Sequence, residues 1–386
     1  MTVSSVPLAE LVEDGSISYG IVQPGSDGEH GVPIVRVGDL ESGSLKGAKP
    51  QMRVDPAVEA KFVRTRLRGG EVLVSLVGSV GRAAVVPPEL SGWNVARAVG
   101  VLRPAAVEAN WLVYALRSRT CQEQISAVLN TTVQATLNLA DLKRLLVPMP
   151  ERKVREAIAE VLGALDDKIA ANAGLVDACD NLRRAKFESL LSGEALPLSS
   201  LARFVNGRAY TKGASGTGRV VIRIAELNSG IGGSTVYNDI DVPEDNRARP
   251  GDLLFAWSGS LVAARWYRPE GIVNQHIFKV IPEPGWPLWL VACALDKKLE
   301  DFRAIAADKA TTMGHIQRHH LDELVSIPPT SEMASNDRAM TALWDRALAA
   351  EVESLKLADL RDTLLPHLMS GRITVREAEQ QVEAVI

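Results

Sequence analysis

Several features are scarce in this chain of 386 residues, and each scarcity excludes a class of protein. The only cysteines, Cys121, Cys179 and Cys293, form no Cys-x-x-Cys pair, which excludes a disulfide framework and indicates no zinc site. No run of about 18 apolar residues occurs, and the first residues lack a basic segment followed by an apolar one. We therefore expect neither a secretory signal nor a transmembrane helix, and a cytoplasmic location.

Excess positive charge is also lacking, because 43 Lys and Arg face 47 Asp and Glu, a formal net charge of −4. This balance excludes a chain that holds nucleic acid through its overall positive charge, but it leaves room for a local basic surface. Apolar residues, in contrast, make up 46% of the chain, enough for two or three domains with cores of their own.

The common catalytic and cofactor motifs are missing as well. The segment from Gly213 to Gly218 spaces two glycines as a phosphate-binding loop does, but Arg219 and Val220 stand where Lys and Ser or Thr are required. His315, His319 and His320 lack an HExxH glutamate or a cysteine partner, which disfavours a metal site. No Gly-x-Ser-x-Gly elbow occurs. We expect no catalytic residue, no cofactor and no metal.

An internal repeat is the most informative feature that is present. The segment from Gly70 reads GEVLVSLVGS and the segment from Gly251 reads GDLLFAWSGS, and further landmarks recur around them in the same order. Their separation falls from 190 residues at the first landmark, Pro7 and Pro197, to 178 at the last. A repeat of this length indicates a duplicated domain and not a solenoid unit.

Each copy changes from short strand-like runs, broken by Gly and Pro, to one long helical pattern. Shorter helical patches, at Trp111–Leu129 and Leu288–Ile305, lie among the strand-like runs, so the fold class is α/β. The long patterns have apolar residues at steps of three and four, and the second covers about Asn336–Leu365. We predict mixed α/β globules at 1–150 and 194–330, a long helix at 151–193, and a long helix with a tail at 331–386.

Each long helix needs a partner, since a helix of roughly 37 residues spans on the order of 55 Å and exceeds one small globule. We expect the two helices to pack antiparallel, with a pseudo-two-fold relation between the copies. Two such copies suit either two half-sites on DNA or two protein partners, and the pattern alone leaves both open. The positions expected in the helix pair are Leu162, Leu165, Ile169, Leu182, Leu343, Leu348, Leu355 and Leu364.

Three stretches resemble the specificity subunits of type I restriction-modification systems. The segment Arg152–Asn172 resembles the start of that family's central helix, and Leu360–Val375 resembles its C-terminal signature. GDLLFAWSGS together with NQHIFKV, Asn274–Val280, resembles the core of a target recognition domain. The first copy departs from this pattern, because Ala96–Val101 stands in place of NQHIFKV and limits what can be carried over to that copy.

The resemblance implies a non-catalytic host-defence protein that reads a split sequence in double-stranded DNA, one half-site per recognition domain. It also implies partners, namely two methyltransferase subunits on the long helices and a translocating restriction subunit. The chain has no Asn-Pro-Pro-aromatic or Asp-Pro-Pro-Tyr tetrapeptide, so methyl transfer is expected on a partner. A protein-binding scaffold and a nucleotide hydrolase are the competing classes, which salt-dependent DNA binding and ATP turnover would distinguish.

Candidate DNA contacts follow from local charge and from differences between the copies. From Lys61 to Arg103 seven basic residues face two acidic ones, which favours contact with phosphates. Polar loop residues that the copies do not share are expected at base edges, with Arg on guanine and Asn or Gln on adenine. The candidates are Arg64, Arg66, Arg68, Arg82, Asn94, Arg97, Thr132, Gln134 and Asn138 in the first copy, and Arg208, Tyr210, Lys212, His276, Thr312, His315, Gln317 and Arg318 in the second.

Overall fold

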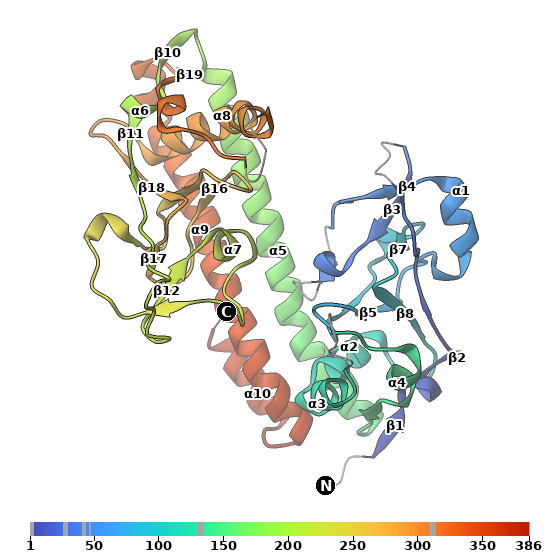
Figure 1. Ribbon diagram of the computed structural model, residues 1–386. Coiled ribbons are helices and arrows are strands. Elements are labelled where there is room, and N and C mark those ends of the chain that lie inside the picture. Colours follow the sequence, from blue (N-terminus) through green and yellow to red (C-terminus); the bar gives the residue numbers. More distant parts are fainter. Residues whose placement is uncertain are drawn as a thin grey trace. The chain divides into compact units, whose positions relative to one another are not determined.

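The computed structural model describes residues 4–25, 30–40, 44–45, 48–129, 135–308 and 314–385, and divides into two compact units. Unit 1 comprises residues 1–171 and 356–386, and unit 2 comprises residues 172–355. The two longest helices, α5 (Arg152–Leu190) and α9 (Thr330–Ser370), each contribute to both units (Figure 1).

The described residues of unit 1 form three small sheets, with strand orders β1-β9, β2-β8-β5-β6 and β4-β3-β7. Only β3 and β7 pair in parallel among these strands. The strands are β1 (Ser5–Pro7), β2 (Val12–Tyr19), β3 (Val32–Val35), β4 (Arg53–Val54), β5 (Val72–Ser75), β6 (Ala83–Val85), β7 (Asn94–Val95), β8 (Val99–Pro104) and β9 (Leu146–Pro148). The helices are η1 (Leu8–Leu11), η2 (Val37–Leu40), α1 (Pro56–Glu59), η3 (Ala60–Thr65), η4 (Pro88–Leu90), α2 (Ala109–Arg117), α3 (Arg119–Ala127), α4 (Leu139–Arg144) and, after α9, α10 (Val375–Glu383).

Unit 2 repeats this plan, with strand orders β10-β19, β11-β18-β15-β16 and β13-β12-β17-β14. Its strands are β10 (Glu194–Pro197), β11 (Ala202–Asn206), β12 (Arg219–Ile222), β13 (Tyr237–Asn238), β14 (Arg247–Ala248), β15 (Leu253–Ala256), β16 (Val262–Arg265), β17 (Gly271–Val273), β18 (Ile277–Pro282) and β19 (Leu324–Ile327). Its helices are α6 (Leu198–Leu201), α7 (Ile224–Ser229), η5 (Glu244–Asn246), α8 (Leu288–Asp308) and η6 (Arg318–Asp322).

The repeated Gly-acid pair has a structural reason that is the same in both units. Gly70 and Gly251 have φ angles of +86° and +101°, in the left-handed region that favours glycine. The next residue, Glu71 or Asp252, accepts a hydrogen bond from the backbone N–H three residues before it, at 2.8 and 2.7 Å. The pair therefore forms the turn that leads into β5 and β15.

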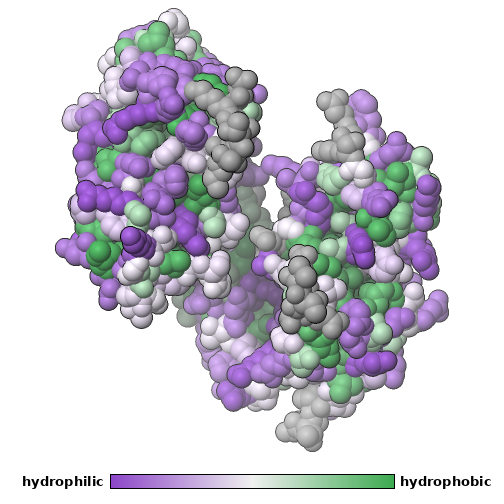
Figure 2. Space-filling view, viewed as in Figure 1, coloured by the Kyte–Doolittle hydropathy of each residue, from purple (hydrophilic) through white to green (hydrophobic). Residues whose placement is uncertain are grey.

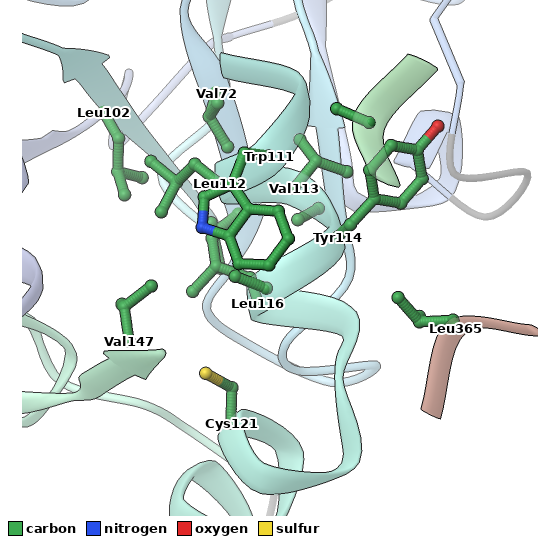
Figure 3. Packing of buried hydrophobic residues seen from close by; sticks show 14 of the residues in the cluster. Val72, Leu102, Trp111, Leu112, Val113, Tyr114, Leu116, Cys121, Val147 and Leu365 are labelled. Carbon is green, nitrogen blue, oxygen red and sulfur yellow. The ribbon is translucent and has the colours of Figure 1, made fainter. Parts of the chain in front are cut away.

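The main core of unit 1 lies between α2 and the four-stranded sheet (Figure 3). Trp111 is fully buried, and Val72 of β5 and Leu102 of β8 belong to the same cluster. Leu365 of α9 joins this core as well. In unit 2 the matching tryptophan, Trp289 of α8, is likewise buried in the core.

The helices α5 and α9 run antiparallel within each unit, because residues further along α5 contact residues earlier in α9. In unit 1 the Arg361 guanidinium lies 2.5 Å from the carboxylate of Asp166. In unit 2 Asn172 donates a hydrogen bond to Glu353 at 2.6 Å, and Arg183 lies over the ring of Trp344, 5.3 Å from its centre.

The residues expected in the helix pair take different positions. Leu162, Leu165 and Leu364 are buried in the main core of unit 1, and Ile169 packs half-buried against it. Leu343 packs half-buried in unit 2, where Leu348 and Leu355 are also half-buried.

Two expectations about the helices are wrong. Leu182 is 57% exposed, because the adjacent Arg183 occupies the inward-facing position. The second long helix does not end before Pro366 but continues through it to Ser370.

The side chains on the face shown in Figure 2 are a mosaic of hydrophilic and apolar residues in both units. Within the described ranges, no helix is both long enough and apolar enough to cross a membrane.

Candidate nucleic-acid interface

In each unit a glycine lets one loop approach the C-terminal end of a strand, β7 or β17, very closely. A Cβ atom on Gly20 would lie 1.9 Å from the carbonyl oxygen of Val95, and one on Gly207 would lie 2.1 Å from that of Asn274. These distances leave no room for any side chain. The residue after each glycine forms an isolated parallel bridge, Ile21 with Ala96 and Arg208 with Asn274.

The backbone around these loops is hydrogen-bonded in the same way in both units. The bonds are Arg97 N–H to Ile21 O (2.9 Å) and Leu76 N–H to Ala98 O (2.8 Å) in unit 1, and Gln275 N–H to Arg208 O (2.9 Å) and Trp257 N–H to His276 O (3.1 Å) in unit 2. Antiparallel bridges add Thr136 next to Val77 and His315 next to Ser258. We call the five matched positions the variable edge: Ile21, Leu76, Arg97, Ala98 and Thr136 in unit 1, and Arg208, Trp257, Gln275, His276 and His315 in unit 2.

The two variable edges share a backbone but none of their five side chains. In unit 1 only Arg97 is exposed, while Ile21 and Leu76 are buried. In unit 2 four of the five side chains are exposed and Trp257 is half-buried.

Exposed arginines lie near the variable edge in the sequence of unit 1. The side chains of Arg64, Arg68 and Arg97 make no hydrogen bond or ion pair with any other described residue. Their charges are therefore available to an anionic partner. Arg82 is half-buried and has an interaction partner within the protein.

Arg66 is exposed, but its guanidinium is already paired within the protein, because it donates two hydrogen bonds to Glu59, at 2.9 and 2.5 Å. The hydrogen bond from Arg66 is the main reason why the pKa of Glu59 lies below its usual value, and burial opposes this shift. Glu59 itself is 2% exposed. Arg66 therefore serves to pair this buried carboxylate.

Asn94 is not placed to contact a base, contrary to expectation. Its side chain is fully buried, donates to Glu59 at 2.9 Å and accepts from the hydroxyl of Thr65 at 2.7 Å. It thus holds η3 against β7. Asn138 is exposed, but its side-chain oxygen accepts the backbone N–H of Asp141 at 2.8 Å and caps α4.

In unit 2 the exposed cations Arg208, Lys212 and Arg318 have no side-chain partner among the described residues. Tyr210 is half-buried, and its hydroxyl donates to Asn246 at 3.2 Å, which fixes the loop that carries Arg208. Gln317 is exposed and precedes η6. Thr132, Gln134 and Thr312, the remaining sequence-based candidates, lie outside the described residues.

Sequence reasoning missed Trp257, which lies close to two of the predicted histidines. The centre of its ring is 5.1 Å from that of His276 and 6.4 Å from that of His315. Its position in the repeat is occupied by Leu76 in unit 1, and this exchange inside the GDLLFAWSGS segment is the signal that could have identified it.

Two alternative sites gain no support from the geometry. The part of the chain that the structure describes contains no group of three or more His, Cys, Asp or Glu able to hold a metal ion. After Gly218 the strand β12 begins with Arg219, whose guanidinium lies 3.1 Å from Glu270. A phosphate-binding loop would instead lead into a helix.

Comparison with known proteins gives matches to restriction-modification proteins. Residues 27–178 match the type I restriction modification DNA specificity domain. The chain is 30% identical over 158 residues to the type I restriction enzyme EcoBI specificity subunit of Escherichia coli, over 40% of this chain and 33% of that protein. The chain thus matches about a third of the length of this curated relative.

Solved structures of the same kind of subunit match almost the whole chain. The type I restriction-modification S subunit from M. genitalium matches with a TM-score of 0.52 and 15% identity, over 95% of this chain and 96% of that one. The HsdS subunit from Thermoanaerobacter tengcongensis matches with a TM-score of 0.37 and 15% identity, over 96% and 97%. The first match confirms the predicted fold class. The family model over residues 27–178 and the Escherichia coli relative confirm the predicted resemblance to the specificity subunits of type I restriction-modification systems.

Proposed function

We propose that this protein reads a bipartite sequence in double-stranded DNA, with unit 1 on one half-site and unit 2 on the other. The variable edge is the observation that carries the proposal. A common backbone that presents different side chains in the two units suits recognition of two different half-sites, since loops on a fixed scaffold carry sequence-reading groups. In this proposal residues 1–150 and 194–330 are the two recognition domains, and 151–193 and 331–386 form the helices between them.

The distribution of free cations supports this function. Arg64, Arg68 and Arg97 in unit 1, and Arg208 and Lys212 in unit 2, are exposed and unpaired within the described residues. Exposed cations of this kind bind phosphates and release counterions, so affinity falls steeply as salt rises. They would fix the position on the duplex, while the variable edge reads the bases.

The same proposal assigns the chemistry to partner proteins. We infer two methyltransferase subunits on α5 and α9, joined by a restriction subunit, in the cytoplasm where the host genome lies. The Escherichia coli relative is named as the specificity subunit of a type I restriction enzyme, which supports a role as one part of a larger enzyme. This protein would then direct methylation and cleavage without catalysing either.

Genome-wide methylation mapping tests the proposal. Cells that express this chain with its neighbouring methyltransferase are compared with cells that express the methyltransferase alone. A split methylation motif that requires this chain is the expected result, and exchange of residues 1–150 for those of a relative changes one half of the motif only. An unchanged methylation pattern would contradict the proposal.

A further inference from the structure

The variable edge of unit 2 carries a compact group of rings, formed by Trp257, His276 and His315, which we call the tryptophan–histidine cluster. The centre of the indole lies 5.1 Å from the ring centre of His276 and 6.4 Å from that of His315, and both imidazoles are exposed. At the matched positions unit 1 has Leu76, Ala98 and Thr136. Backbone hydrogen bonds match the first two to Trp257 and His276, and a β-bridge matches Thr136 to His315.

Three contacts fix the position of Trp257. Its Nε1–H donates to Oδ1 of Asn206 at 2.9 Å, and its ring packs 5.8 Å from that of Phe278. Its backbone N–H is bound to the carbonyl of His276 at 3.1 Å. Trp257 is therefore fixed, and its ring packs near both imidazoles. This packing restricts the imidazoles before binding and so lowers the entropy that they lose when they bind a ligand.

His276 also has a strained backbone. Its φ of +72° lies in the left-handed region, where only one other non-glycine residue, Asp14, is found among the described residues. Such conformations cost free energy, and they persist where the surrounding structure imposes them, often at functional sites. Here the imposed conformation belongs to an exposed imidazole immediately before β18, next to Gln275, whose backbone N–H donates to Arg208 O.

We propose that His276 and His315 read base edges in the half-site of unit 2, and that Trp257 is the positioning residue for both. An imidazole N–H donates a hydrogen bond, and the major-groove acceptors are purine N7, guanine O6 and thymine O4. Because N7 is the acceptor that adenine and guanine share, we take a purine edge in duplex DNA as the predicted ligand. This inference rests on the proposed function, because it needs a half-site that unit 2 recognises.

The test uses duplexes that carry the mapped target, with 7-deazapurine replacing one purine at a time, and the full chain bound to its methyltransferase. Loss of N7 at one or two positions in the half-site of unit 2 should weaken wild-type binding about 10-fold, the value of a good base contact. Binding by His276→Gly or His315→Ala should already be weaker and insensitive to that replacement. Trp257→Ala should remove the sensitivity at both positions, whereas Trp257→Phe should retain part of it.

Several controls separate base reading from a structural role. His276→Gly suits the left-handed backbone, so its Tm should be unchanged or higher although its discrimination is lost. The half-site of unit 1 should respond to 7-deazapurine equally in wild type and all variants. If wild type binds its target specifically but the histidine variants keep the full sensitivity to loss of N7, the inference is overturned while the proposed function stands. If wild type shows no sequence preference, the proposed function itself fails.

Discussion

Units 1 and 2 keep a buried arginine at the same place in the repeat but bind it differently. In unit 1 Arg361 donates to the carboxylate of Asp166 at 2.5 Å. In unit 2 Arg183, which precedes it by 178 residues, lies over the indole of Trp344 and 3.4 Å from Asp296. Trp344 follows Asp166 by the same 178 residues, so a carboxylate in one unit is an aromatic ring in the other.

This difference shows what the duplication preserved. Both units have an arginine where α5 meets α9, and both supply an acceptor of positive charge, either a carboxylate or the face of an indole. In unit 2 burial raises the pKa of Asp296 despite the nearby charge of Arg183, which also lies 3.5 Å from Asp180. The position of the arginine contact between α5 and α9 was retained, whereas the partner of the arginine changed from a carboxylate to an aromatic ring.

The largest expected effect comes from removing the ring. Trp344→Ala should lower the free energy of unfolding of unit 2 by about 3–5 kcal/mol, because it opens a cavity and exposes both Arg183 and Arg265, which lies 4.6 Å from the ring centre. Hydrogen exchange measured on peptides of each unit checks this result, since two units need not unfold together. An equal loss of protection in unit 1 and unit 2 would contradict it.

Removing the carboxylate in unit 1 should have a somewhat smaller effect. Asp166→Asn leaves Arg361 and Arg117, which lies 3.8 Å from Asp166, with only the more exposed Asp362 as a shared charge partner, at a cost of about 2–3 kcal/mol. The exposed Asp359→Asn on α9 is the matched control and should change the stability by less than about 0.5 kcal/mol. Equal effects of the two changes would show that the ion pair adds nothing.

In both units an acidic residue, Asp39 after β3 and Glu226 after β12, accepts a hydrogen bond from a backbone N–H. Glu226, 1% exposed, accepts the backbone N–H of Arg223 at 3.0 Å, as Asp39 accepts that of Arg36 at 2.7 Å in unit 1. Burial favours a higher pKa for Glu226, but the hydrogen bonds from the side chain and backbone of Arg223 outweigh it and lower the pKa.

Because the pKa of Glu226 is lower in the folded than in the unfolded protein, its stabilisation is present above the unfolded value of about 4.3 and disappears as the pH falls through the folded value. Glu226→Gln should therefore cost about 1.5 kcal/mol at pH 7 and progressively less below pH of about 4. Urea unfolding of both proteins over this range measures the difference. A difference that grows toward acid pH would have the wrong sign.

The smallest effects are expected on the exposed and half-buried faces of the long helices. Leu182→Asp should change the free energy of unfolding by no more than about 0.5 kcal/mol, since its side chain is 57% exposed. Leu355→Asp should cost more, about 1 kcal/mol, because this side chain is half-buried. Thermal unfolding distinguishes the two, and equal shifts in Tm would contradict the exposures described for them.

The sequence predicted elements and the repeat better than individual contacts. Periodicity identified α5 and the landmarks GEVLVSLVGS and GDLLFAWSGS located β5 and β15, because these patterns depend on local burial. The same pattern wrongly placed Leu182 on the inward face of α5, because it takes account of hydrophobicity alone. In the structure Arg183 faces inward instead, because the ring of Trp344 and the carboxylate of Asp296 contact its guanidinium.

The candidate interface was harder to predict for a related reason. Charge alone does not show whether an arginine is free, as Arg97 is, or paired with a carboxylate, as Arg66 is. Asn94 looked like a base contact because it is polar, yet its partners, Glu59 and Thr65, come from α1 and η3, 35 and 29 residues away in sequence. Such long-range hydrogen bonds leave no local trace in a sequence.

The division of α5 and α9 between the units has a consequence for synthesis on the ribosome. Unit 2 is one continuous segment, but unit 1 takes its last part from residues 356–386. The hydrogen bond between Asp166 and Arg361 joins residues 195 positions apart. At about 5–20 residues per second, on the order of 10–40 s separates translation of the two partners. For that time the apolar face of α5 that Leu357 and Leu364 will cover awaits the rest of the chain, and nascent chains stalled within this interval would be the ones most in need of a chaperone.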